Sequence, residues 1–208
     1  HTIVTQELKT LLAYNKWLHP SNTIAIKDKR EDQTYSVRIS TDGSKTETGV
    51  GYGIAIYINT EPVQKLRYRP DNRCSNNQAE QFAILKATDE LKLNNIAAKT
   101  AAIHTDYRIT LDLLRNNSNQ HTLIKDIKRN IQALEVKHWS IHFAWVKAHV
   151  GNEANELADL LAKLAAGNPD MDVAYARIPF STIKYELKEV FTEILGARMV
   201  KHYKWQSD

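Results

Sequence analysis

The chain has 208 residues with a single cysteine, 42% of its residues are hydrophobic, 25% are charged, and its formal net charge is +4. This length and composition are typical of one soluble globular domain with extensions, and no apolar run is long enough to span a membrane. The lone Cys74 excludes a disulfide framework and a cysteine-based zinc site within one chain. It fits a reducing compartment, so we expect an intracellular protein of the cytoplasm or nucleus.

The N-terminal residues 1–33 mix a short amphipathic segment with a polar, charged run and are expected to form a connector. The chain starts at His1 without Met and lacks the pattern of a secretory signal, as expected of a piece excised from a longer protein. Alternating apolar and polar residues then predict a strand over 35–42, with Asp42 at its end. The same alternation predicts strands at 52–58 and 66–68, which complete an antiparallel meander.

The segment from Ser75 to Gln78 has the form of a capping box and predicts a helix. Glu80 then lies in the first turn of that helix, beside its apolar stripe. A short apolar segment predicts a buried strand over 101–105, with Asp106 at its carboxyl end. The remaining elements predicted from apolar periodicity are two helices, a strand and a final helix, at 107–114, 122–136, 139–145 and 154–165.

This order of elements predicts an α/β fold with a five-stranded mixed sheet, an antiparallel three-strand meander plus two parallel strands, flanked by helices. Trp139 and Trp145 of the last strand are expected in the core. Asp42, Glu80 and Asp106 all fall at the ends of predicted elements. Sheet geometry can bring those ends together, so the three acids are candidates for one site.

Four motifs stand in the order typical of the ribonuclease H family: TDGS at 41–44, NNQAE at 76–80, TD at 105–106 and HVGNEANELAD at 149–159. The chain resembles that family over residues 34–167, which implies an RNase H domain there and leaves 168–208 as a C-terminal extension with an amphipathic helix. The TDGSKTETGVGYG opening and the NNQAE motif look most like the domains of non-LTR retrotransposons. This resemblance implies an upstream reverse transcriptase in the same polyprotein as a partner.

The resemblance implies an endonuclease that hydrolyses the RNA strand of RNA·DNA hybrids. It also implies four metal ligands, Asp42, Glu80, Asp106 and Asp159, which hold two Mg²⁺ ions, with Mn²⁺ as a substitute. Two divalent ions about 3.5 to 4 Å apart can activate the attacking water and stabilise the leaving 3′ oxygen, and hard oxygen ligands select these metals. In the family's arrangement Asp42 bridges both ions, Asp106 and Asp159 each complete one side, and Glu80 holds the ion or water nearest the leaving group.

The other expected site residues also follow from the resemblance. His149, on a glycine-bearing loop, is expected as a catalytic residue that helps a proton reach the leaving group or helps the product leave. Asn76, Asn77 and Gln78 match family positions that touch RNA sugar, which fits a hybrid that displays 2′-hydroxyls in a wide, shallow minor groove. Asn155 is expected to orient its segment and is grouped with the substrate-binding residues.

The connection between the second and third helices is shorter than in the cellular enzymes of the family, which usually carry an extra basic helix and loop there. The resemblance therefore does not imply tight autonomous binding of a hybrid. A modest basic face is expected to replace part of that missing basic helix and loop, with contributions from Lys125, Lys128 and Arg129. Such a run of charges is, however, most often only the solvated face of a helix.

Simpler interpretations compete with each of these assignments. A single acid is more often a solvated surface carboxylate or a helix cap than a catalytic group, and Asn76 and Asn77 are of the types that cap helices. Two rival functions also remain. An inert RNase H-like scaffold would have lost one or more acids, and a transposase or integrase core would keep only three carboxylates and lack the HVGNEANELAD run; this chain keeps all four acids and that run.

Overall fold

The computed structural model describes residues 35–93, 99–116, 118–119, 121–148, 151–175, 182–192 and 194. The predicted connector 1–33 lies outside the described residues. The strands run in chain order as β1 (Val37–Lys45), β2 (Val50–Ile58), β3 (Glu61–Pro70), β4 (Thr100–Thr105), β5 (Ser140–Trp145) and β6 (Val173–Tyr175). The helices are α2 (Asn76–Leu93), α3 (Arg108–Arg115), α4 (Thr122–Val136) and α5 (Glu153–Ala166).

The strands form one mixed sheet in the order β5-β4-β1-β2-β3-β6. Strands β1, β2 and β3 are antiparallel neighbours, whereas β4 is parallel to β1 and β5 is parallel to β4. The predicted mixed α/β architecture is therefore confirmed. The predicted number of five strands is wrong, because the short β6 adds a sixth strand parallel to β3.

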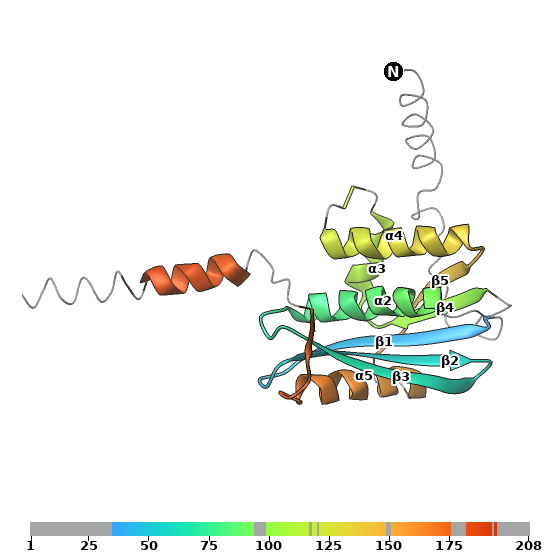
Figure 1. Cartoon of the computed structure of the whole chain (residues 1–208), viewed down its shortest axis with the longest axis horizontal. Helices are drawn as coiled ribbons and strands as arrows, with labels where there is room; N and C mark the ends of the chain where they lie inside the picture. Colours follow the sequence, from blue (N-terminus) through green and yellow to red (C-terminus); the bar gives the residue numbers. More distant parts are fainter. Residues whose placement is uncertain are drawn as a thin grey trace, which may run out of the picture.

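The helices cover the two faces of the sheet unequally. Helices α2, α3 and α4 lie on one side, and α5 lies alone on the other (Figure 1). On the three-helix side, strand residues such as Ile39 and Phe143 belong to one buried cluster with Ile84 of α2 and Ile127 of α4. Burial of apolar side chains of this kind is the main source of free energy for folding.

The predicted start of α2 is confirmed in detail. The Gln78 backbone N–H donates to Ser75 Oγ at 3.2 Å, and Gln78 Oε1 accepts from the Ser75 backbone N–H at 2.9 Å. This reciprocal pair is a capping box, which satisfies two donors that the first turn of a helix leaves open. The cap therefore fixes where α2 begins and, with it, the position of Glu80.

Strand β1 does not end at Asp42, as the sequence pattern predicted. Its pairing with β4 ends at Thr41 opposite Thr105, but its pairing with β2 continues until Lys45 faces Val50. The antiparallel hairpin supplies backbone partners for three residues beyond Asp42. Asp42 therefore lies inside β1, at the point where the parallel neighbour ends.

The residues beyond α5 contribute to the folded unit. In β6, Val173 faces Arg69 and Tyr175 faces Pro70, and the Tyr175 carbonyl accepts from the Asp71 backbone N–H at 2.8 Å. The Tyr175 ring lies 3.9 Å from the Phe82 ring, centroid to centroid. Strand β6 thus covers an edge of β3 and packs an aromatic side chain against the core.

This packing predicts different outcomes for two C-terminal truncations. Removing everything after Gly167 deletes β6 and the Tyr175 contact, so we expect a loss of about 2 kcal/mol in the free energy of unfolding. A truncation after Tyr175 keeps both and serves as the control. Thermal unfolding monitored by circular dichroism checks this, and equal melting temperatures for the two truncations would show that β6 does not stabilise the domain.

Residues 182–192 are helical, and the large apolar side chains in this part of the chain are exposed. They include Ile183, Leu187, Val190 and Phe191. Within the described residues, no helix is both long enough and apolar enough to cross a membrane.

Candidate metal centre

Three of the four predicted metal ligands meet at one edge of the fold. Asp42 and Asp106 directly follow Thr41 and Thr105, which are register partners in the parallel pair β1 and β4. The two carboxylates therefore emerge from neighbouring strands at the same level. Glu80 joins them from α2, and one carboxylate oxygen from each of the three lies within 4.8 Å of the others.

Gly43 allows α2 to approach β1 closely enough for Glu80 to reach this cluster. A Cβ atom at position 43 would lie 2.5 Å from the Glu80 backbone nitrogen and 2.8 Å from the Ala79 carbonyl carbon. These are backbone atoms that cannot rotate away, so a side chain at position 43 would push the helix outward. The glycine after Asp42 is thus required by the close approach of two backbones.

Burial and mutual repulsion dominate the electrostatics of the cluster. Asp42 is 6% exposed and Glu80 is 3% exposed. Burial, followed by the charges of Asp106 and Asp159, raises the pKa of Asp42 to about 8. Burial, followed by the charges of Asp42 and Asp106, raises the pKa of Glu80 to about 10. The protein alone thus disfavours full ionisation of these acids near neutral pH.

The same residues suit a hard divalent cation. All the donors are carboxylate oxygens, which are the ligands that Mg²⁺ and Mn²⁺ prefer. Glu80 Oε2 is buried, and it has no hydrogen-bond partner among the described residues. A cation among Asp42, Glu80 and Asp106 would stabilise their negative charges and satisfy that oxygen.

Asp159 approaches the cluster from the opposite face of the sheet, on α5. Gly53 is the β2 partner of Asp42, and a Cβ atom at position 53 would lie 2.2 Å from the Ala158 carbonyl oxygen. The absence of that Cβ allows α5 to lie directly on β2, which brings Asp159 near Asp42. Its charge raises the pKa of both Asp42 and Glu80.

Asp159 has a partner that the sequence analysis did not identify. Its Oδ2 atom forms an ion pair with Lys163 Nζ at 2.7 Å, one helical turn further along α5. The Lys163 charge also acts to lower the pKa of Asp42. The spacing of four residues on one helix was the signal for this pair.

The three predicted RNA-contacting residues lie at the start of α2. Asn76 and Asn77 are exposed, and Gln78 is half-buried in the capping box described above. The Tyr107 hydroxyl, at the start of α3, donates to Asn77 Oδ1. Asn77 is therefore exposed beside the acidic cluster but already engaged by another side chain.

The structure places Asn155 but does not describe His149. Asn155 is only 3% exposed, and its Oδ1 is buried without a hydrogen-bond partner in the described part of the chain. Its backbone N–H donates to Asn152 Oδ1 at 3.4 Å, which caps α5. Such burial favours an orienting role over contact with a substrate. His149 lies outside the described residues.

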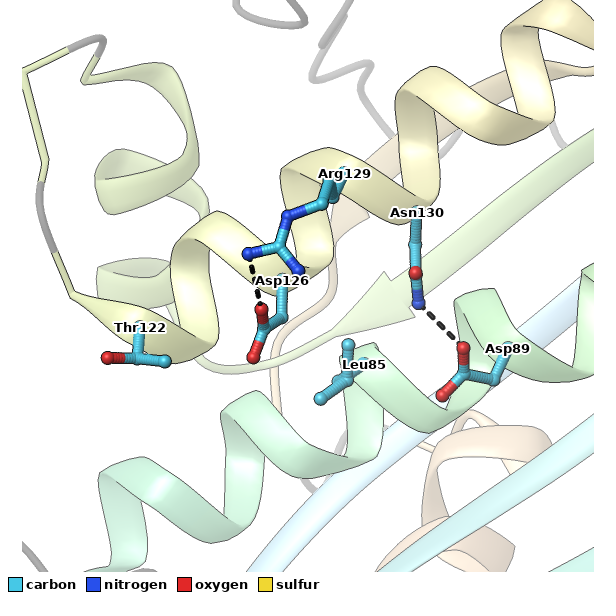
Figure 2. Close-up of a pocket in the computed structure, with 6 residues that line it drawn as sticks. All are labelled: Leu85, Asp89, Thr122, Asp126, Arg129 and Asn130. Carbon is cyan, nitrogen blue, oxygen red and sulfur yellow. Dashed lines mark hydrogen bonds and ion pairs between the residues drawn. The ribbon is translucent and has the colours of Figure 1, made fainter.

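The predicted basic face on α4 is wrong for Lys128. Lys128 is 8% exposed, and its Nζ donates to the Asn116 carbonyl at 2.6 Å. Arg129 is exposed but forms an ion pair with Asp126 at 2.9 Å. Figure 2 shows Arg129 and Asp126 in the pocket between α2 and α4, where Asn130 also donates to Asp89. On this part of α4, Lys128 is therefore removed from the surface, and the charge of Arg129 is balanced by Asp126.

Comparisons with known proteins agree with the sequence motifs. Residues 34–167 match the model of the RNase H family. The ribonuclease H of Vibrio vulnificus (strain YJ016) is 31% identical over 147 residues, which cover 67% of this chain and 94% of the relative. The ribonuclease H of Syntrophus aciditrophicus is 28% identical over 169 residues, covering 74% and 91%.

Part of the chain also aligns with solved structures. The N-terminal RNase H domain of rv2228c from Mycobacterium tuberculosis aligns with a TM-score of 0.49 at 23% identity, covering 62% of this chain and 98% of that chain. RNase H1 from the archaeon Halobacterium salinarum aligns with a TM-score of 0.47 at 18% identity, covering 62% and 96%.

Proposed function

Because this chain belongs to the RNase H family and is a ribonuclease H, we propose that it hydrolyses the RNA strand of RNA·DNA hybrids with two bound divalent cations. The observation that carries this proposal is the convergence of Asp42, Glu80 and Asp106, whose oxygens lie within 4.8 Å of one another at the edge of the sheet. Mg²⁺ is the proposed metal, and Mn²⁺ is its substitute.

Each of the four acids has a distinct place around the proposed cations. Asp42 lies centrally, with Asp106 beside it directly after β4. Asp159 approaches from α5, and Glu80 joins from α2. When bound, divalent cations lower the pKa of a coordinated water and stabilise the charge that develops on the leaving oxygen. The chain's own contribution is to hold four carboxylates in fixed positions with two strands, β1 and β4, and two helices, α2 and α5.

His149 is proposed to assist with proton transfer or product release rather than to hold a cation. Loss of a general acid or base typically costs about 10² to 10⁴ in rate. We therefore expect His149→Ala to lower kcat by that order while the Mg²⁺ concentration for half-maximal activity stays near that of the parent. If high Mg²⁺ instead restores the full rate, His149 supports the metal site.

Recognition of the hybrid is proposed to use Asn76, Asn77 and Gln78, because they lie at the start of the helix that carries Glu80. Their polar groups can test for the 2′-hydroxyls that distinguish RNA from DNA. Asn155 is proposed to have an indirect role in recognition, by orienting the start of α5.

The biological setting is proposed to be reverse transcription by a retroelement. This rests on the TDGSKTETGVGYG opening and the NNQAE motif, which resemble non-LTR retrotransposon domains. In this setting 1–33 connects the RNase H domain at 34–167 to an upstream reverse transcriptase, and 168–208 forms an extension.

One substrate panel tests the proposed function against its two rivals. The full chain is incubated with Mg²⁺ and labelled RNA·DNA hybrid, single-stranded RNA, duplex RNA or duplex DNA. We expect cleavage of the hybrid alone. Absence of any cleavage would indicate an inert scaffold, and nicking of duplex DNA would indicate a nuclease of the transposase type.

A further inference from the structure

Trp145 is an exposed aromatic residue next to the acidic cluster. Its side chain is 40% exposed, although it is the last residue of β5 and its neighbours Phe143 and Val146 are buried. Exposing a large aromatic surface to water is unfavourable, so the position of this indole needs a specific contact to explain it. Trp145 Nε1 donates to the carbonyl oxygen of Asp106 at 2.9 Å.

This hydrogen bond adds a contact between β5 and the chain that follows β4, at the point where the pairing of the two strands ends. The regular pairing of β4 with β5 ends at Thr105 opposite Trp145. One residue further, the Val146 backbone N–H donates to the Thr105 carbonyl at 3.0 Å, and the Trp145 indole then donates to the Asp106 carbonyl. The end of β5 therefore contacts two successive carbonyls, one through its backbone and one through a side chain.

The two bonds act on both peptide groups that flank the Cα atom of Asp106. The Thr105 carbonyl belongs to the peptide group before Asp106, and the Asp106 carbonyl belongs to the one after it. Each is held by the end of β5. The Tyr107 backbone N–H also donates to Thr105 Oγ1 at 3.1 Å, which restrains the same turn. The backbone of Asp106 is thus fixed although its strand has ended.

From this geometry we propose that Trp145 is a positioning residue for the metal centre, because its indole N–H fixes the backbone from which the Asp106 carboxylate reaches Asp42 and Glu80. The proposal rests on the proposed function, in which Asp106 is a metal ligand. Ligand positions in metal sites must be held within a few tenths of an ångström, and partners that orient ligands affect affinity strongly. Loss of such partners typically lowers metal affinity or activity about 10- to 100-fold.

The test compares the same substitution at two tryptophans. Trp145→Phe removes the indole donor and keeps an aromatic ring. Trp139→Phe is the matched control. Trp139 is buried and directly precedes β5, so it lies at one end of this strand while Trp145 lies at the other. Mn²⁺ affinity is measured by calorimetry on the full chain without nucleic acid, and melting temperature is measured in parallel.

We expect Trp145→Phe to weaken Mn²⁺ binding by about 10-fold, with a melting temperature close to that of the parent. It should also raise the Mg²⁺ concentration for half-maximal cleavage, with little change in KM for the hybrid. Trp139→Phe should lower the melting temperature more and leave Mn²⁺ affinity unchanged. Trp145→Tyr, which also lacks a donor at the indole position, should repeat the result of Trp145→Phe and serves if the latter folds poorly.

Two results would overturn the proposal. The first is Mn²⁺ affinity of Trp145→Phe and Trp145→Tyr within twofold of the parent, and the second is an equal loss of affinity in Trp139→Phe.

Asp106→Asn separates a failure of this proposal from a failure of the proposed function. If Asp106→Asn weakens Mn²⁺ binding but the Trp145 variants do not, only the positioning role is wrong. If Asp106→Asn binds Mn²⁺ like the parent, Asp106 is not a ligand and the proposed site itself is wrong.

Discussion

Asp42→Asn is expected to remove hybrid cleavage almost completely. The substitution keeps the shape of the side chain but removes the central negative charge of the cluster, which lies in β1 between Asp106 and α5. Stabilisation by bound cations contributes several kcal/mol to catalysis of this kind, so the rate should fall by about 10³-fold or more. Single-turnover cleavage of a labelled hybrid in Mg²⁺ gives the measurement.

Asp112→Asn serves as the control for this prediction. Asp112 is an exposed carboxylate on α3, outside the three-carboxylate cluster, so its loss should leave the rate near that of the parent. Hybrid binding by Asp42→Asn should largely remain, because the substitution alters no apolar core contact. A cleavage rate for Asp42→Asn within tenfold of the parent would mean that the metal site has been misplaced.

The same substitution is expected to stabilise the fold when divalent cations are removed with EDTA. Burial and neighbouring acids raise the pKa of Asp42 to about 8, well above the value of an aspartate in an unfolded chain. Between pH 4 and 8 the folded state therefore binds more protons than the unfolded state, so the free energy of unfolding falls as the pH rises. An asparagine does not titrate and avoids this loss, by an amount on the order of 2 to 4 kcal/mol at pH 8.

Denaturant unfolding in EDTA at pH 5 and pH 8 measures this effect. The advantage of Asp42→Asn over the parent should be small at pH 5 and larger at pH 8, whereas Asp112→Asn should follow the parent at both. Mg²⁺ should stabilise the parent more than the variant, because a ligand that binds only the folded state stabilises it. Equal stability of parent and Asp42→Asn at both pH values would show that Asp42 is not held in a repulsive, buried cluster.

The sequence predicted most elements because their periodic patterns are long. The stripe of α5 and the alternation of β2 each extend over enough residues to distinguish a helix from a strand. The three acids could be placed near one another because they follow or begin such elements. Strand β6 was missed because it has only three residues, and its pairing with β3 depends on contacts about 100 residues apart in sequence.

Individual side chains were harder to predict than elements. Alternation along β5 placed Trp145 in the core, but the residue is 40% exposed and its indole N–H reaches the Asp106 carbonyl beyond the end of β4. Lys128 was placed on the solvated face of α4, yet its apolar stem is buried and its amine reaches the Asn116 carbonyl. Both outcomes depend on one hydrogen bond to a distant backbone carbonyl, which no local pattern reveals.

The most direct test of the account uses one RNA·DNA hybrid whose two strands carry different fluorescent labels. The full chain is incubated with this hybrid in Mg²⁺ and, separately, in Ca²⁺, whose larger and looser coordination sphere does not hold two ions and a water in line. The account predicts that Mg²⁺ supports cleavage of the RNA strand while the DNA strand stays intact, and that Ca²⁺ supports neither. Cleavage of the DNA strand, strong activity in Ca²⁺ alone, or an intact RNA strand in Mg²⁺ would contradict it.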